Sequence, residues 1–404
     1  MSWKAKLIVF TICIYFTSAS YTMIVPFLPL YLLELGANQN NIEFWTAVIF
    51  SVSFFVGGVM APLWGKLADK KGQKSMSVRS SAMLCIAYLC GGIVVSPLQL
   101  LGMRVLQGFA NGYLPSVLSR VSSFSPTDKL GSSLGFIQSS QLVGTVSGPL
   151  IGGVLAHLFG MRSSFFIAGT FLLIVFLVTA FVPGEEIAKN NEKQEKSSIV
   201  NDFKFTVKDK NLRELLSLFF LFSLVMLAIQ PILSLYVGEL IESREDMAFY
   251  AGIACSLPSF VGAFTAPFWG SFGQRRGFYL SMSCAFFGAA FFLFIQGFAQ
   301  SITYLFVTGA GMGLFIVGIV PSINAALSLA TTPQFRGRGF GMMTMAGQFG
   351  CMLGPLLSGA VVHTFSLNVQ FHISGAFLFL MSFYTFRRHI HLKRSRRNKF
   401  KKQG

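Results

Sequence analysis

The chain has 404 residues, of which 53% are hydrophobic and only 12% are charged, and its formal net charge is +17. A typical soluble domain has about 25% charged residues, so this composition excludes an ordinary soluble protein and indicates one that spans a membrane. No P-loop, zinc-protease helix or nucleophile elbow occurs, so the sequence predicts neither an enzyme nor a cofactor or metal site.

Apolar runs long enough to cross a hydrocarbon core of about 30 Å recur along the whole chain. Helices are expected for these runs, because a helix satisfies its own backbone polar groups in lipid, whereas barrel strands would alternate in polarity. The run that begins at Leu7 is longer than the apolar core of a signal peptide, so it predicts a first helix that is retained. We expect twelve transmembrane helices in all, over residues 7–33, 44–64, 76–96, 98–119, 132–157, 163–182, 212–238, 247–270, 278–299, 302–330, 338–364 and 369–386.

Lys and Arg residues are distributed unevenly over this predicted topology. Of the 32, Arg104 lies well inside a predicted helix, and Arg162 and Arg244 fall on the side away from the N-terminus. The other 29 (32 − 3) fall on the side of the N-terminus, so the positive-inside rule places both termini in the cytoplasm. We expect a multi-pass protein of the cytoplasmic (inner) membrane, whose basic tail rests on anionic lipid and does not bind nucleic acid.

The sequence repeats itself with an offset of 205 (266 − 61) or 206 (318 − 112) residues. Six predicted helices separate equivalent points, so the two halves enter the membrane with the same orientation. The matching pairs are 26–35 with 231–240, 61–72 with 266–277, 112–116 with 318–322, and 144–149 with 350–355. We therefore predict an N-terminal six-helix bundle (1–182), a cytoplasmic linker (183–211), a C-terminal six-helix bundle (212–386) and a basic cytoplasmic tail (387–404).

The segment between the second and third predicted helices, with its repeat, predicts a gate on the cytoplasmic side. Its glycines permit a tight turn, and Asp69 can accept hydrogen bonds from a helix end or pair with a basic group, as a latch would. The alternative is that these charges only set the topology. Gln274 replaces the acidic residue in the second copy, so the two gates need not be equivalent. The gating-loop candidates are Gly65, Asp69, Lys70, Lys71, Gly72, Arg275 and Arg276.

Arg104 is the one formal charge that this topology places well inside a predicted helix. An ionisable group in the membrane interior is costly, which points to a function, with a static brace of the first helix as the alternative. Gln107 and Asn111 follow at three and seven positions, on roughly the same helix face, and extend a polar stripe toward a central cavity. The remaining cavity-lining candidates are Tyr21, Gln138, Gln230, Asn324 and Gln348.

Glycines of the fifth and eleventh predicted helices form small-residue faces that allow helix backbones to approach closely. We interpret them as a hinge between the two halves, with ordinary tight packing as an alternative of equal weight. The hinge candidates are Gly144, Gly148, Pro149, Gly152 and Gly153, with Gly350, Gly354 and Pro355 in the second copy.

Three motifs in this twelve-helix, two-half arrangement resemble those of the major facilitator superfamily. They are the Gly65–Lys74 segment, Leu100-x-x-x-Arg104-x-x-Gln107-Gly108, and Gly144-x-x-x-Gly148-Pro149-x-x-Gly152-Gly153. The resemblance implies an all-α fold of two pseudo-symmetric bundles. In that family the third motif marks antiporters, especially bacterial drug:proton efflux pumps.

The resemblance further implies a secondary transporter that exports small amphiphilic or cationic compounds by alternating access, with protons as the coupling ion. The 45 Phe and 16 Met residues suit such substrates, because aromatic faces accept cations and apolar surface. If protons drive transport, the coupling candidates are Glu34, Asp69 and Arg104. The alternative is a carrier of the same fold for one endogenous metabolite, sugar or siderophore, and a receptor or scaffold is a remoter one. Membrane lipids are expected partners, and no protein partner is implied.

Overall fold

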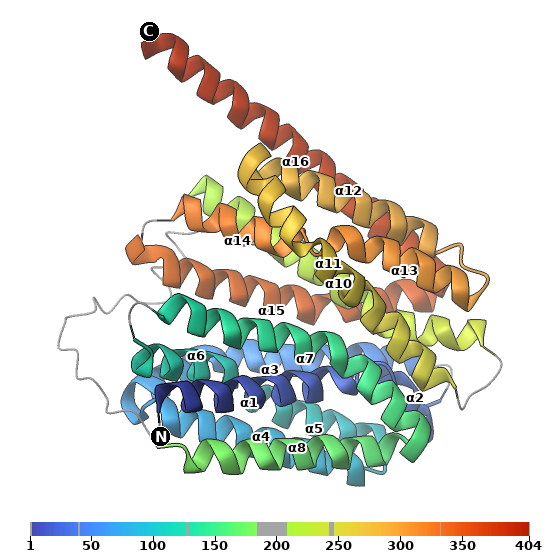
Figure 1. The fold of residues 1–404 in the computed structure, drawn as a ribbon. Helices are drawn as coiled ribbons and strands as arrows, with labels where there is room; N and C mark the ends of the chain where they lie inside the picture. The colour runs from blue at the N-terminus through green and yellow to red at the C-terminus, as the bar shows by residue number, and fades with distance from the viewer. Residues whose placement is uncertain are drawn as a thin grey trace. The chain divides into compact units, whose positions relative to one another are not determined.

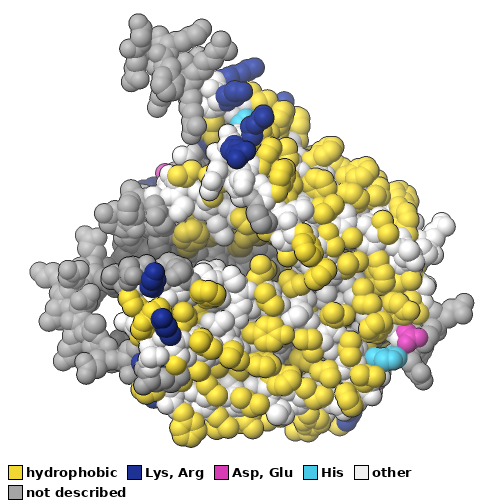
Figure 2. Space-filling model, in the orientation of Figure 1, with side chains coloured by type: hydrophobic (Ala, Val, Ile, Leu, Met, Phe, Trp, Pro, Cys, Tyr) yellow, Lys and Arg dark blue, Asp and Glu magenta, His cyan; other side chains and the backbone are white. Residues whose placement is uncertain are grey.

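The computed structural model describes residues 2–38, 41–126, 129–183, 208–241, 246–331 and 333–403. Over these ranges the chain forms helices and no strand, and eleven helices are long and apolar enough to cross a membrane. Hydrophobic side chains dominate the face drawn in Figure 2. A monomeric soluble protein rarely exposes so much contiguous apolar surface, so this is a multi-pass membrane protein of all-α fold.

The described helices fall into two compact units. Unit 1 comprises Met1–Lys193 and Leu233–Ser256, and unit 2 comprises Gln194–Ile232 and Leu257–Gly404. Helices α10 (Lys210–Leu240) and α11 (Met247–Arg276) contribute to both units. The other helices of unit 1 are α1 (Trp3–Met23), α2 (Leu28–Glu34), α3 (Ile42–Lys71), α4 (Gln73–Ile93), α5 (Pro97–Phe109), α6 (Tyr113–Phe124), α7 (Leu130–Phe159) and α8 (Met161–Phe181). Those of unit 2 are α12 (Phe278–Gln296), α13 (Ile302–Ile316), α14 (Ile319–Ala330), α15 (Pro333–Thr364) and α16 (Leu367–Gln403), labelled in Figure 1.

The sequence repeat is preserved in the packing inside each unit. In unit 1, α1 lies along α7, and α4 lies along α8. In unit 2, α12 lies along α16, which pairs the third and sixth predicted spans of the second half as α4 and α8 pair those of the first. The predicted linker falls almost entirely on residues 184–207, outside the described ranges, so the division into two bundles stays a prediction.

The fourth predicted span, 98–119, is not one continuous helix. It is divided into α5 and α6, and Gly112 between them has a φ of +117°, a conformation that favours glycine. Pro115 follows in the first turn of α6, where its missing N–H costs nothing. Neither short helix is long enough to cross a membrane alone, so this stretch is missing from the eleven candidate spans. The repeat has a milder interruption: α13 ends at Ile316 and α14 begins at Ile319, but Gly318 has a helical φ of −76° and Ile302–Ala330 counts as one span.

The first predicted span is also interrupted, between α1 and α2. Pro26 and Pro29 stand three residues apart here, and each removes a backbone donor from the same stretch of helix. The equivalent positions of the second half are Pro231 and Ser234, and α10 continues through both. In this chain a single proline is accommodated within α10, whereas α1 ends just before the segment that holds two prolines.

Two further boundaries differ from the prediction. Helix α3 continues through most of the predicted gating loop, so that only Gly72, with a φ of +83°, links it to α4. The turn therefore rests on Gly72, and Gly65 lies within the helix. At the other end of the chain, α16 does not stop near residue 386 but runs on to Gln403 (Figure 1), because no Gly or Pro follows Gly375 within it.

Candidate functional site

Arg104 in α5 is the centre of a buried polar group in unit 1. Its side chain is 3% exposed, and its Nη1 donates to Oε1 of Gln107 at 2.7 Å. Gln107 in turn donates from Nε2 to the hydroxyl of Tyr88 at 3.1 Å. The guanidinium carbon lies 5.7 Å from the ring centre of Phe50, and Tyr21 of α1 is close enough to interact with it electrostatically.

The guanidinium of Arg104 is only partly satisfied. Its Nε and Nη2 are buried and have no hydrogen-bond partner among the described residues. A buried donor without an acceptor costs about 1–3 kcal/mol, and more when it is charged. The predicted role of Arg104 as a brace of the first helix would require these donors to reach α1 carbonyls, and no such bond occurs in the described part of the chain.

The break between α5 and α6 is held by α4. Arg79 donates from Nη1 to the carbonyl oxygen of Phe109 at 3.0 Å and from Nη2 to that of Asn111 at 2.9 Å. The Ser80 hydroxyl donates to the carbonyl of Ala110. These bonds satisfy carbonyls that the end of a helix leaves without partners. The Arg79 guanidinium also stacks on Trp64 at 3.6 Å.

The sequence analysis counted Arg79 and Arg120 among the charges that set topology, and the structure shows that both also have structural roles. Arg120 is 1% exposed, donates to the Ser77 hydroxyl at 3.0 Å and to the Pro183 carbonyl at 3.1 Å, and lies over the ring of Phe10. It thereby ties α6 to α4 and to the end of α8. The available signal for Arg79 was its position inside the predicted helix 76–96.

The predicted stripe of Arg104, Gln107 and Asn111 is only partly present. Gln107 joins Arg104, but Asn111 lies beyond the end of α5, so it does not continue the same helix face. Its side-chain oxygen accepts from the backbone N–H of Gly112 at 2.9 Å. Gln138 is exposed on α7. The other candidates belong to unit 2, where all three are half-buried: Gln230, Asn324 and Gln348.

Most of the predicted hinge glycines of α7 pack against α1. A Cβ on Gly148 would overlap the Thr22 hydroxyl, and one on Gly152 would overlap the Met23 carbonyl. These two residues and Gly144 therefore pack tightly against α1 within unit 1, and the hinge stays a prediction. Pro149 lies inside α7, which remains one helix.

Gly153 faces a different helix. A Cβ there would lie 2.6 Å from the Ala248 carbonyl oxygen and 3.2 Å from the Cα of Gly252, both in the first turns of α11. It is thus the motif glycine that meets a segment from the second half of the sequence. In unit 2, Gly350 and Gly354 lie against Phe220 and Leu224 of α10, as their counterparts lie against α1, and Pro355 lies inside α15.

The remaining predicted residues lie at helix ends. Asp69 and Lys70 belong to the last turn of α3, and Gly65 lies earlier in the same helix. The structure does not describe the side-chain environment of these three residues. Lys71 is exposed at the end of that helix. Arg275 and Arg276 are exposed in the last turn of α11. The latch therefore stays a prediction.

Glu34 ends α2 and has Arg162 of α8 as its charged neighbour. Partial burial raises the pKa of Glu34, and the Arg162 guanidinium lowers that pKa by less. The groups that interact electrostatically with Arg104 are Tyr88 and Tyr21, so the structure does not place Glu34 beside Arg104.

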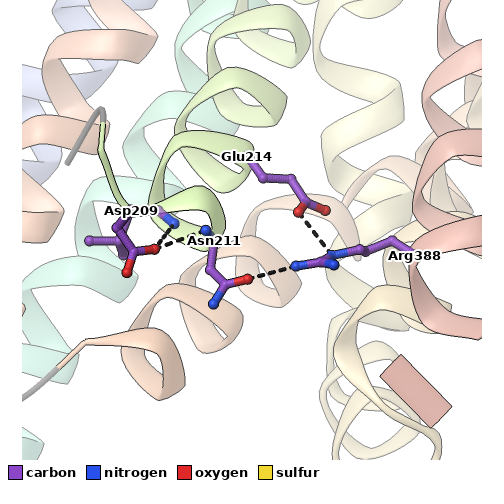
Figure 3. Close-up of polar contacts among 5 residues, drawn as sticks. Asp209, Asn211, Glu214 and Arg388 are labelled. Atoms are coloured by element: carbon purple, nitrogen blue, oxygen red, sulfur yellow. Dashed lines mark hydrogen bonds and ion pairs between the residues drawn. The ribbon is translucent and has the colours of Figure 1, made fainter. Parts of the chain in front are cut away.

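Unit 2 contains a buried ion pair that the sequence analysis did not anticipate (Figure 3). Arg388 of α16 contacts Glu214 of α10 at 2.9 Å, with 14% and 5% of the two side chains exposed. Nη2 of Arg388 also donates to Oδ1 of Asn211 at 2.6 Å. The Asp209 carboxylate accepts from the N–H groups of Asn211 and Leu212 and so caps the start of α10. These contacts join α10 to α16. The sequence analysis did not predict Arg388 as a partner of Glu214, because it assigned Arg388 to the cytoplasmic tail.

Comparison with known proteins agrees with this architecture. The family described as Major Facilitator Superfamily matches residues 10–249 and 245–403. Multidrug resistance protein MdtG of Proteus mirabilis is 30% identical over 394 residues, covering 95% of this chain and 96% of that protein. The Multi-drug resistance efflux pump PmrA homolog of Lactococcus lactis is 31% identical over 403 residues, covering 96% and 97%.

Solved structures show the same fold at low sequence identity. A crystal structure of the nucleoside transporter NupG aligns with a TM-score of 0.75 at 16% identity, over 96% of this chain and 99% of that chain. A POT family transporter in complex with 5-aminolevulinic acid also gives 0.75, at 11% identity over 94% and 95%. The family match, the full-length relatives and the helical architecture agree, and the chain belongs to the major facilitator superfamily.

Proposed function

We propose that this protein is a secondary transporter that exports small amphiphilic compounds, cationic ones among them, by alternating access. Relatives at about 30% identity over nearly the whole chain bear the names multidrug resistance protein and efflux pump. The glycine motif of α7, which marks antiporters in this family, supports export. The observation that carries the proposal is the buried guanidinium of Arg104, two of whose donors have no partner among the described residues.

Arg104 is suited to bind an acceptor that arrives with the substrate. The groups around it are the amide of Gln107, the hydroxyls of Tyr88 and Tyr21, and the ring of Phe50. A carbonyl, ether or hydroxyl oxygen of a substrate would accept a hydrogen bond from Nε or Nη2 and remove the cost of leaving these buried donors unpaired. Amphiphilic substrates with such an oxygen are therefore expected to bind here, and a cationic group of the same substrate would lie away from Arg104.

The coupling ion we propose is the proton, with Glu34 as its binding group and Asp69 and Arg104 as the residues that convert its binding into movement. The raised pKa of Glu34 supports this role, because its carboxyl keeps a proton to a higher pH than a fully solvated glutamate does. Asp69 at the end of α3 would close the cytoplasmic side as a latch.

We further propose that the protein lies in the cytoplasmic (inner) membrane with both termini inside the cell. The excess of Lys and Arg on the side of the N-terminus supports this orientation. The moving bodies would be the bundles 1–182 and 212–386, joined by the linker 183–211.

The test is transport by the purified protein in proteoliposomes with an imposed pH gradient. Gradient-dependent transport of several unrelated amphiphilic dyes is the expected result. Transport of one metabolite only, with all dyes excluded, would establish the single-substrate carrier instead. Dye transport at the same rate with and without the pH gradient would contradict proton coupling, but it would still be consistent with export.

A further inference from the structure

A cavity of about 730 Å³ opens within unit 2, at the helix ends on the same side as the C-terminal tail. Its walls come from the start of α10, the turn between α11 and α12, the end of α14 and the extended part of α16. Of the residues that line it, only Arg275 and Arg276 are gating-loop candidates, and no substrate or proton site was proposed here.

Cationic side chains form one wall of the cavity. Arg275 and Arg276 stand in the last turn of α11, and Lys393 and His389 face the same space from α16. Among the described residues that line it, none is acidic. The nearby carboxylate of Glu214 already pairs with Arg388, so it does not neutralise this wall.

The turn between α11 and α12 adds donors to the cationic wall. Gly277 has a φ of +102° and precedes α12, whose start has no side-chain cap. The first residues of α12, Phe278 to Leu280, line the cavity, and the N–H groups of a first helical turn attract anions. Gly277 also lies close to the ring of His389, since a Cβ there would be 3.6 Å from its Cε1.

The rest of the lining is largely apolar. It includes Leu215, Leu280, Ala326, Leu392 and Leu329, and Leu329 is 77% exposed. A free phosphate ion gains no binding free energy from apolar side chains. A phospholipid can place its phosphate against the cations and its acyl chains against the apolar side chains.

We propose that this cavity binds the phosphate headgroup of an anionic phospholipid, with the upper part of the acyl chains against Leu329. The topology supported by the distribution of Lys and Arg puts the cavity at the cytoplasmic leaflet, where such lipids can reach it. The bound lipid would join the turn after α11 to α16, two segments that the Arg388 ion pair does not connect. Binding does not depend on the proposed export and can be measured without it.

The test measures lipid binding to the purified full-length protein in detergent. Phosphatidylglycerol, phosphatidylcholine and inorganic phosphate are added separately, and retained lipid and the unfolding temperature are recorded. The test variant is Arg275→Gln/Arg276→Gln/Lys393→Gln. The control variant Lys4→Gln/Lys6→Gln/Lys74→Gln removes the same charge from unit 1. Arg275→Lys/Arg276→Lys keeps the charge and separates loss of binding from misfolding.

We expect phosphatidylglycerol to bind and stabilise the protein, phosphatidylcholine to do so weakly, and inorganic phosphate not to compete. Each cation near a membrane surface strengthens anionic-lipid binding about fivefold, so the test variant should bind about 100-fold more weakly. The control and the lysine variant should bind like the wild type. Equal weakening in the test and control variants would show a general charge effect and overturn the site. Competition by inorganic phosphate at similar affinity would overturn the lipid as its ligand.

Discussion

Arg79 stabilises an interruption that the site requires. Its guanidinium binds the carbonyls of Phe109 and Asn111 and stacks on Trp64, so the end of α5 next to Arg104 depends on it. Arg79→Gln should lower the free energy of unfolding by about 1–3 kcal/mol, because two hydrogen bonds from a charged group to carbonyls at the end of α5 are lost. Thermal unfolding in detergent measures this, with Lys74→Gln as a control that removes a charge from the start of the same helix. A variant as stable as that control would show that the break is held by other contacts.

Glu34 is the residue from which we expect the pH dependence of export. Because partial desolvation raises the pKa of this carboxyl, a proton is available for exchange up to a higher pH than for a fully solvated glutamate, and is lost above that pKa. With the gradient held constant, export in proteoliposomes should fall as the pH of both sides is raised through this pKa. Glu34→Gln should have low export with no such dependence, while Glu43→Gln should behave as the wild type. A wild-type pH profile in Glu34→Gln would remove Glu34 from coupling.

At the scale of the helix, the close contact of α7 with α1 is set by Gly152. An added methyl group would overlap the Met23 carbonyl, so the two helices must separate. Gly152→Ala should therefore lower the free energy of unfolding by about 1–3 kcal/mol, as overpacked sites do. Gly135→Ala is the matched control on the same helix, since nothing lies within 4 Å of a Cβ there, and it should be neutral or slightly stabilising. Equal unfolding temperatures of the two variants would show that α1 can move aside at no cost.

The sequence predicts which segments cross the membrane far better than where their helices stop. Hydropathy averages over a window, so the runs around Gly112 and Pro26 read as continuous, although a positive φ in one and a second proline in the other end the helix. Two features of the sequence could have predicted these helix ends: the repeated Gly-x-x-Pro-Ser motif, and the presence of Pro29 where the second half has Ser234. The same averaging separated the tail from α16, where the helix continues because nothing in its sequence stops it.

The candidate site was predictable in part for a similar reason. Arg104 was evident because a lone charge in an apolar run is costly, and Gln107 because it lies one turn away. Arg79 and Arg388 were not, since a charge near a span end carries the same sequence signal whether it faces water or binds a carbonyl. Their roles depend on contacts between segments 30 (109 − 79) and 174 (388 − 214) residues apart, which no local pattern encodes.

At the scale of the whole molecule, the fold is shared with the family and repeated in its two halves, whereas Arg104 occurs in one half only. The repeat places equivalent contacts in each unit, so that Gly148 meets α1 as Gly354 meets α10. Arg104 breaks this symmetry, because the second half has Gly309 or Ala310 at the equivalent position. The substrate recognition that we propose for Arg104 would therefore belong to the first half alone, and removal of that charge should stop export without disturbing the other half.

Export by Arg104→Lys and Arg104→Gln, at matched protein levels in proteoliposomes with a pH gradient, tests this claim most directly. Lysine keeps the charge but loses the planar fork, whereas glutamine removes the charge. We expect partial export by Arg104→Lys and almost none by Arg104→Gln, with both proteins folded in the membrane. Equal export by the two variants would contradict the account and reduce Arg104 to a structural residue.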